Sequence, residues 1–164
     1  MKHLIFLFFI GILITSCQNS GKKVSTLVNG ELNWLSMEDL DNLNNDEEKL
    51  FLVDVYTDWC GWCKVMDKKT FTDSKIKTFL DENFYVVKFN AEQKEPIQFN
   101  GKEYEWKSSG RRGVNMLAVD LLNGRLGYPS LVFLDSDLNK IQVVAGYKTA
   151  DQLMNVLKDM KAVL

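Results

Sequence analysis

Two cysteines separated by two residues, Cys60 and Cys63, follow an apolar segment and open a segment with helical periodicity. The apolar segment, Leu50–Tyr56, is interrupted by one acid, Asp54, and predicts a buried parallel strand. The next segment, Gly61–Lys69, predicts a helix that begins at the cysteine pair. A buried strand that leads directly into a helix is typical of α/β folds, so this junction limits the fold more than any other part of the sequence.

The position of the cysteine pair favours redox chemistry. A thiol at the start of a helix lies beside unpaired backbone N–H groups and the positive end of the helix dipole, which favour the reactive thiolate. The second cysteine, one turn further along, can reach the first sulfur and close a disulfide, so that the pair forms a two-electron couple. The alternatives are half of a zinc site, for which there is no second CxxC, and a structural disulfide, which in so short a loop would constrain little of the chain.

The first residues predict an export signal. An unbroken apolar run, Leu4–Ile14, is too short to span a bilayer comfortably, which needs about 20 residues. It leads into Ile14-Thr15-Ser16-Cys17, which resembles the lipobox of bacterial lipoproteins, where cleavage leaves the cysteine as a lipidated N-terminus. We expect a lipoprotein signal peptide at 1–16, a lipidated tether at 17–31 and a folded domain at 32–164. The alternatives are an ordinary secretory signal and a buried N-terminal strand.

Cleavage before Cys17 would remove His3, the only histidine. The mature chain could then use neither Cys-His nor Ser-His-Asp catalysis, and the two remaining cysteines are too few for a four-cysteine zinc site. We therefore expect no metal and no cofactor, and chemistry that depends on Cys, Asp, Lys or Tyr. The 20 Lys and Arg against 22 Asp and Glu also exclude a polycation built to bind nucleic acid.

The rest of the chain continues the alternation of strands and helices. The expected elements are a helix opened by Ser36–Asp39, a helix at Asp73–Asp81, a strand at Phe84–Phe89, a hairpin of Leu131–Leu134 with Ile141–Ala145, and a last helix opened by the capping box Thr149–Gln152.

A long insert, about 91–127, precedes the last hairpin. Asn100-Gly101 predicts the turn of a short hairpin, Ser108–Gly113 a polar loop and Val114–Leu122 a helix. Because the insert runs up to the segment before the last hairpin, it could lie beside the cysteine pair and influence the choice of partner. Two of its arginines, Arg111 and Arg112, would then bind an acidic partner; a solvated loop is the alternative.

The segment Val53–Lys64, Val-Asp-Val-Tyr-Thr-Asp-Trp-Cys-Gly-Trp-Cys-Lys, resembles the active-site segment of the thioredoxin superfamily. The resemblance covers the chain from about Leu32 onward. Within the superfamily, Lys64–Phe71 and the following Thr72-Asp73 are similar to the C-terminal thioredoxin-like domain of the DsbD family and to related envelope thioredoxin-like lipoproteins. The resemblance implies an α/β thioredoxin fold, with a central mixed β-sheet flanked by helices and a hairpin-plus-helix insert before a cis-proline loop.

The resemblance also implies roles outside the pair. Asp54 matches the buried carboxylate that relays a proton to and from the second cysteine, since burial raises the pKa of an acid; an acid that only satisfies hydrogen bonds of the strand is the alternative. Lys88 matches a lysine that modulates the pKa of this carboxylate, although it could simply face outward. Pro129 matches the cis-proline opposite the pair, which leaves the backbone of Tyr128 free to bind an extended substrate segment; a proline that only starts the following strand is the alternative.

In the implied mechanism, Cys60 is the nucleophile and Cys63 resolves the mixed disulfide. Trp59, Gly61 and Trp62 would contact the substrate around the exposed sulfur; a role in packing alone is the alternative for either tryptophan. Trp62 stands where thioredoxin has proline.

The sequence therefore predicts a lipid-anchored thiol-disulfide oxidoreductase in the cell envelope, facing the periplasm and reducing protein disulfides. Its expected partners are protein disulfides, a membrane or periplasmic thiol that donates electrons, and the membrane itself through the lipid on Cys17, but no nucleic acid. A disulfide oxidase or isomerase is one alternative, because the outer compartment is oxidising. The other is a non-catalytic thioredoxin-fold binding module, in which Cys60 would be buried or unreactive.

Overall fold

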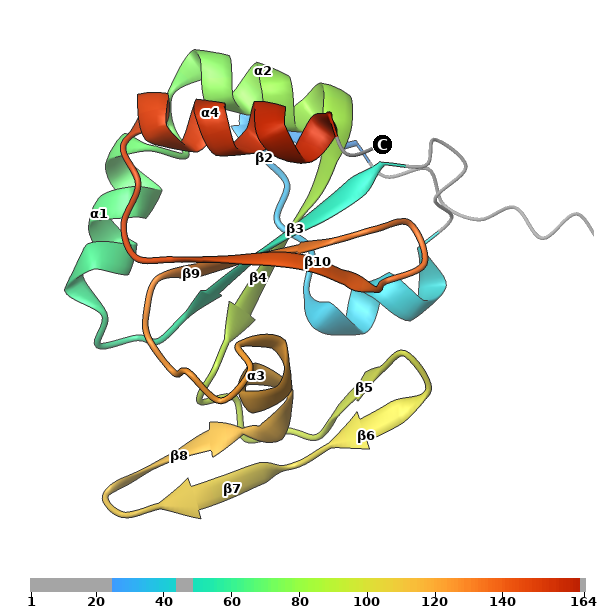
Figure 1. The fold of residues 1–164 in the computed structure, drawn as a ribbon, viewed down its shortest axis with the longest axis vertical. Helices are drawn as coiled ribbons and strands as arrows, with labels where there is room; N and C mark the ends of the chain where they lie inside the picture. The colour runs from blue at the N-terminus through green and yellow to red at the C-terminus, as the bar shows by residue number, and fades with distance from the viewer. Residues whose placement is uncertain (1–24, 44–48, 163–164) are drawn as a thin grey trace, which may run out of the picture.

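The computed structural model describes residues 25–43 and 49–162. The signal peptide, Cys17 and most of the predicted tether lie outside the described residues. The elements are β1 (Leu27–Val28), β2 (Glu31–Leu32), the 3-10 helix η1 (Met37–Asn42), β3 (Leu50–Tyr56), α1 (Gly61–Lys69), α2 (Ser74–Asn83), β4 (Phe84–Asn90), β5 (Ile97–Phe99), β6 (Lys102–Tyr104), β7 (Trp106–Ser109), β8 (Arg112–Asn115), α3 (Met116–Leu121), β9 (Ser130–Leu134), β10 (Lys140–Ala145) and α4 (Ala150–Lys161), as Figure 1 shows.

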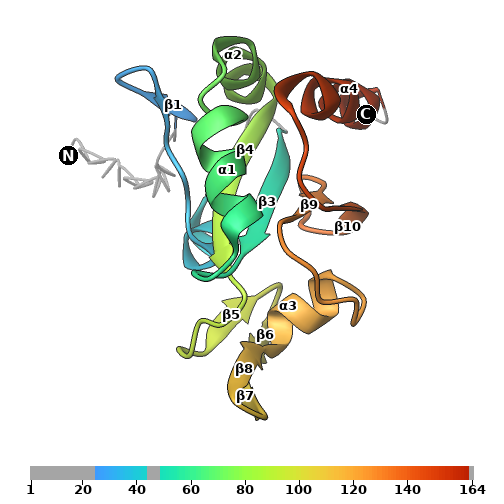
Figure 2. The ribbon, with the colours of Figure 1, turned by 90° about the vertical axis from the view of Figure 1, so that its left-hand side faces the viewer.

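A four-stranded sheet in the order β10-β9-β3-β4 forms the centre of the domain. Strand β3 runs parallel to β4 and antiparallel to β9, and β9 runs antiparallel to β10, so the expected mixed sheet is confirmed. An isolated parallel bridge from Leu35 to Val87 extends the sheet beyond β4. In Figure 1, α2 and α4 lie above the sheet and α1 lies beside it on the left, while α3 and the hairpins of β5–β8 lie below it. Figure 2 shows α1 in front of β3 and β4.

Alternation along the strands divides the core into two layers, because successive side chains of a strand point to opposite faces. Leu50 and Leu52 of β3 pack on one face in a cluster that includes Met66 of α1 and the apolar residues of α2 and α4. Phe51 and Val53 pack on the other face with η1, α3 and β5. Asp54 continues the first of these faces, so its side chain is directed toward α1 rather than toward the insert.

The insert differs from the sequence prediction in its second half. The hairpin about Asn100-Gly101 is present, and both turn residues have the positive φ that a type I′ turn requires. The segment predicted as a polar loop is instead a second hairpin, in which β7 pairs with β8. Its turn places Gly110 at φ +61°, as a type II′ turn requires at its first central position.

The helix of the insert begins at Met116, two residues after the predicted start. Asn115 is the N-cap: its side chain accepts a hydrogen bond from the Leu117 N–H at 3.0 Å, and its backbone remains in β8. The buried Asn115 amide also donates to the carbonyl oxygens of Gln93 and Glu95, both at 3.3 Å. This one side chain therefore ends the strand, starts the helix and ties the insert to the segment after β4.

The folded domain begins before the predicted boundary at Leu32. A short hairpin pairs β1 with β2 about Asn29-Gly30, in a segment assigned to the tether by the sequence analysis. The buried Thr26 hydroxyl donates to the Phe84 carbonyl oxygen at 2.8 Å, which anchors this hairpin to the sheet. The Asn-Gly turn was a signal for it in the sequence. In the part of the chain that the structure describes, no helix is both long and apolar enough to cross a membrane.

Candidate active site

Cys60 and Cys63 form a disulfide at the N-terminus of α1, so the structure shows the oxidised pair. The two Cα atoms are 5.3 Å apart, and Cys60 is the N-cap residue, whose Sγ accepts a hydrogen bond from the Cys63 N–H at 3.1 Å. A sulfur that accepts a helix N-terminal N–H is stabilised when it carries negative charge. The site therefore favours the Cys60 thiolate once the disulfide is reduced.

Exposed aromatic rings surround the buried pair. Cys60 and Cys63 are 4% and 2% exposed, whereas Trp59 and Trp62 are 51% and 62% exposed. Trp59 contacts Tyr128 edge to face, with ring centroids 6.0 Å apart. Trp62 packs against Tyr147, 5.3 Å away, a contact that the sequence analysis did not anticipate. Gly61, the first residue of α1, is exposed between the two tryptophans.

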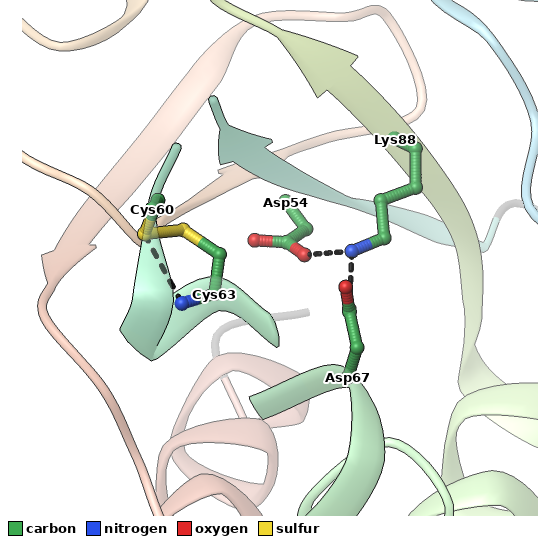
Figure 3. Close-up of polar contacts among 5 residues, drawn as sticks. All are labelled: Asp54, Cys60, Cys63, Asp67 and Lys88. Atoms are coloured by element: carbon green, nitrogen blue, oxygen red, sulfur yellow. Dashed lines mark hydrogen bonds and ion pairs between the residues drawn. A yellow bond between two sulfur atoms is a disulfide. The ribbon is translucent and has the colours of Figure 1, made fainter. Parts of the chain in front are cut away.

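The parallel pairing of β3 and β4 places Asp54 opposite Lys88. The two residues are register partners, and the Lys88 ammonium donates to Asp54 Oδ2 at 2.6 Å. The other oxygen of the carboxylate, Oδ1, is buried and has no hydrogen-bond partner among the described residues. Figure 3 shows the Asp54 carboxylate between the cysteine pair and Lys88, with this unpaired oxygen on the side of the cysteines. The oxygen that faces the cysteine pair is therefore the one that makes no hydrogen bond to a described residue.

Burial raises the pKa of Asp54 above its ordinary value. Lys88 opposes this increase through its charge and its hydrogen bond, while the charge of Asp67 adds to it. For Lys88, burial alone would lower the pKa, but the two neighbouring carboxylates outweigh it and raise the pKa. A carboxyl group with a raised pKa can both accept and release a proton nearer to neutral pH than an ordinary aspartate can.

Asp67 is a member of this cluster that the sequence analysis missed. It lies on α1 one turn after Cys63, and its Oδ1 accepts a hydrogen bond from the same Lys88 ammonium (Figure 3). Asp67 is 42% exposed, whereas Asp54 is 1% exposed, so only Asp54 is fully removed from solvent. The spacing of four residues from Cys63 in a predicted helix was the signal that could have found it.

The cis-proline loop lies beside the pair. The Tyr128–Pro129 peptide bond is cis, as predicted, and the Tyr128 ring contacts Trp59 directly before Cys60. No hydrogen bond between described residues uses the backbone N–H or C=O of Tyr128.

Residues 25–43 and 49–162 contain no group of three or more His, Cys, Asp or Glu side chains that could hold a metal ion. The described site is a disulfide-bonded cysteine pair with a buried carboxylate behind it and exposed aromatic side chains around it. It defines a protein of the thioredoxin-fold class.

A family model of the thioredoxin-like domain matches residues 37–161, and the chain belongs to this family. It is 29% identical over 122 residues to thiol:disulfide interchange protein DsbD of Tatumella citrea, and 27% identical over 124 residues to DsbD of Haemophilus influenzae. These matches cover 73% and 74% of this chain but only 18% of each relative. The expected relationship to the thioredoxin superfamily, close to DsbD, is confirmed.

Solved structures support the fold. The DsbH oxidoreductase has a TM-score of 0.55 at 17% identity, with 94% of this chain and 96% of that chain covered. A thioredoxin from Thermus thermophilus has a TM-score of 0.56 at 14% identity, with 79% and 87% covered. At these identities the similarity establishes the thioredoxin fold alone.

Proposed function

We propose that the protein is a thiol-disulfide oxidoreductase that reduces protein disulfides outside the cytoplasm. The observation that carries the proposal is the oxidised Cys60–Cys63 pair at the N-terminus of α1, backed by the buried Asp54 carboxylate. A structural disulfide has no use for a buried acid with a raised pKa behind it, whereas a cysteine that must lose and regain a proton does.

The first step of the reaction is the attack of the Cys60 thiolate on a substrate disulfide. A bond forms between Cys60 Sγ and one substrate sulfur, the substrate S–S bond breaks, and the second substrate sulfur leaves as a thiolate that takes a proton from solvent. The helix N-terminus stabilises the attacking thiolate. The backbone of Tyr128 holds the substrate segment extended, while Trp59, Gly61 and Trp62 contact its side chains.

The second step releases the substrate. Cys63 transfers its proton to Asp54, and its thiolate attacks Cys60 Sγ, which re-forms the Cys60–Cys63 disulfide and frees the first substrate sulfur. Two electrons have then passed from the pair to the substrate. A thiol donor must supply two electrons to reduce the pair again, and we propose a membrane or periplasmic thiol protein for this role, in keeping with the similarity to DsbD.

The proposed location depends on the N-terminal sequence. The lipobox-like segment ending at Cys17 supports a lipid anchor in the cell envelope, with the domain facing the periplasm. An anchor would keep the domain near a membrane source of electrons.

One observation favours a second candidate, a non-catalytic binding module: Cys60 is only 4% exposed in the oxidised pair. An oxidase would use the same two steps in reverse, with two electrons passing from a substrate dithiol to the Cys60–Cys63 disulfide, whereas an isomerase would rearrange substrate disulfides with no net electron transfer. Trp62 in place of proline is the feature that supports either alternative.

The test is catalysis of peptide-disulfide reduction, with dithiothreitol as the electron source and the free peptide thiols alkylated and counted by mass. We expect substoichiometric protein to raise the rate in proportion to its concentration. A rate equal to that of dithiothreitol alone would contradict the proposal and support the binding module.

A further inference from the structure

The charged side chains of the β7–β8 hairpin are all basic, although the chain as a whole is acidic. Lys107, Arg111 and Arg112 all lie within residues 106–115, which contain no acidic residue, although the net charge of the whole chain is −2. The hairpin extends from the end of the domain that holds α3, away from α2 and α4 (Figure 1). Charge of one sign on one projecting element favours a partner of the opposite charge.

The hairpin contacts the redox site directly. The Arg112 guanidinium lies over the Trp59 ring, 4.3 Å from its centroid, and Trp59 is the residue before Cys60. The Trp59 indole N–H also donates to Glu92 Oε1 at 2.9 Å. The hairpin therefore adjoins the exposed aromatic side chains around the cysteine pair.

A hollow of about 440 Å³ separates the hairpin from the segment after β4. Its charged lining residues are Asp58, Glu92, Lys94, Arg111 and Arg112. The two carboxylates already have donors: Glu92 accepts from Trp59, and Asp58 accepts from the Asn90 amide at 3.3 Å. The three cations, in contrast, make no ion pair with any described residue.

Two of these cations lie over aromatic rings. Arg112 stacks on Trp59, and the Lys94 ammonium lies 5.9 Å from the Trp106 ring centroid. Trp106 in turn covers Gly113 so closely that a Cβ there would lie 2.0 Å from Trp106 Cζ2. Stacking uses the face of a guanidinium and leaves its N–H edge free for a carboxylate, and a side chain already held loses less entropy on binding.

We propose that Lys94, Arg111 and Arg112 form a docking surface for carboxylate side chains that flank the disulfide of a protein substrate. The inference rests on the proposed function and adds a substrate class to it. A protein segment is favoured over anionic lipid because the surface adjoins the sulfur that a substrate disulfide must reach. The two engaged carboxylates in the hollow reduce the attraction but leave the cations in excess.

The test compares two disulfide peptides of the same sequence except for flanking residues, which are Glu in one and Lys in the other. Each substitution is made singly in the full-length protein. The test variant is Arg111→Glu, because Arg111 contacts neither Trp59 nor the cysteines. The matched charge control is Lys75→Glu, on the exposed surface of α2. We expect the wild type to favour the acidic peptide, Arg111→Glu to lower the acidic-to-basic rate ratio about threefold to tenfold, and Lys75→Glu to leave the ratio unchanged. The uncharged Arg111→Gln should fall between.

Several results would overturn the inference. The first is an acidic-to-basic rate ratio near one in the wild type, and the second is an equal effect of Arg111→Glu and Lys75→Glu on that ratio. The third is an Arg111→Glu variant that keeps the ratio but no longer prefers phosphatidylglycerol vesicles to phosphatidylcholine vesicles. That result would mean that the surface binds lipid. If the wild type reduces neither peptide, the proposed function fails. The docking surface can still be tested by measuring the binding of the oxidised peptides to the oxidised protein by fluorescence polarisation. Loss of acidic-peptide binding in Arg111→Glu alone supports the docking surface. Equal binding by all variants rejects the docking surface.

Discussion

Replacing Cys63 with serine is expected to stop turnover and to leave the protein covalently joined to its substrate. The Cys60 thiolate can still attack a disulfide, but no second thiol is placed to attack Cys60 Sγ, which bonds to Cys63 in the oxidised pair. Reductase turnover should fall at least about 100-fold. A mixed disulfide with the substrate should accumulate, visible by mass and released by dithiothreitol.

The matched control is Cys60→Ser, carried out with Cys17→Ser in both variants so that one thiol remains in each. This control should be equally inactive but should form little adduct, because it is the sulfur of Cys60, the N-cap residue, that accepts a backbone N–H at the helix N-terminus and is stabilised there as a thiolate. Adducts formed equally well through either cysteine would contradict the assignment of Cys60 as the nucleophile.

Replacing Asp54 with asparagine is expected to slow the second step and not the first. The amide has almost the same shape but cannot take the proton of Cys63, so release of the substrate should slow by roughly 100-fold at neutral pH, the lower end of the usual contribution of a positioned base. Reduced protein mixed with a chromogenic aromatic disulfide releases one thiol in each step. The first phase of colour should keep its rate, and the second should slow.

The pH dependence follows from the raised pKa of Asp54. Below that pKa the carboxyl is protonated and cannot accept a proton, so the advantage of the wild type over Asp54→Asn should grow as pH rises through it. The advantage should shrink again at alkaline pH, where an ordinary thiol, with a pKa of about 8.5, ionises without help. Asp67→Asn is the control, because it removes the other carboxylate that binds Lys88 and leaves the Asp54 carboxylate unchanged. An equal loss in both variants would mean that the charge of the cluster matters and that Asp54 is not the base.

The central sheet and the cysteine pair could be predicted because their signals are local. Each element is predicted by residues that lie within it or next to it. Examples are the apolar run of β3, the helical pattern after Cys60 and the turn residues. Parallel register then brings Asp54 to Lys88, since both continue the same faces of neighbouring strands. The two short hairpins that were missed also had local signals, at Asn29-Gly30 and Gly110, but their polar residues had suggested a tether and a loop.

The remaining contacts of the site could not be predicted in this way. Arg112 reaches Trp59, and Tyr147 reaches Trp62, across long stretches of sequence. Such contacts depend on how the insert and the end of the sheet pack against α1, and neither periodicity nor spacing encodes that packing. Asp67 was hidden for a different reason, because an acid on an exposed helix usually has no function beyond solvation.

The reduction potential of the Cys60–Cys63 pair tests most directly whether the protein is a disulfide reductase. The full-length chain with Cys17→Ser, in detergent, is equilibrated in graded thiol buffers, quenched in acid and alkylated, so that oxidised and reduced forms are counted by mass. We expect a reversible two-electron transition at or below about −230 mV, toward the range of thioredoxin. A midpoint between about −120 and −180 mV would contradict the reducing direction, and the absence of any reversible two-thiol transition would contradict the enzyme itself.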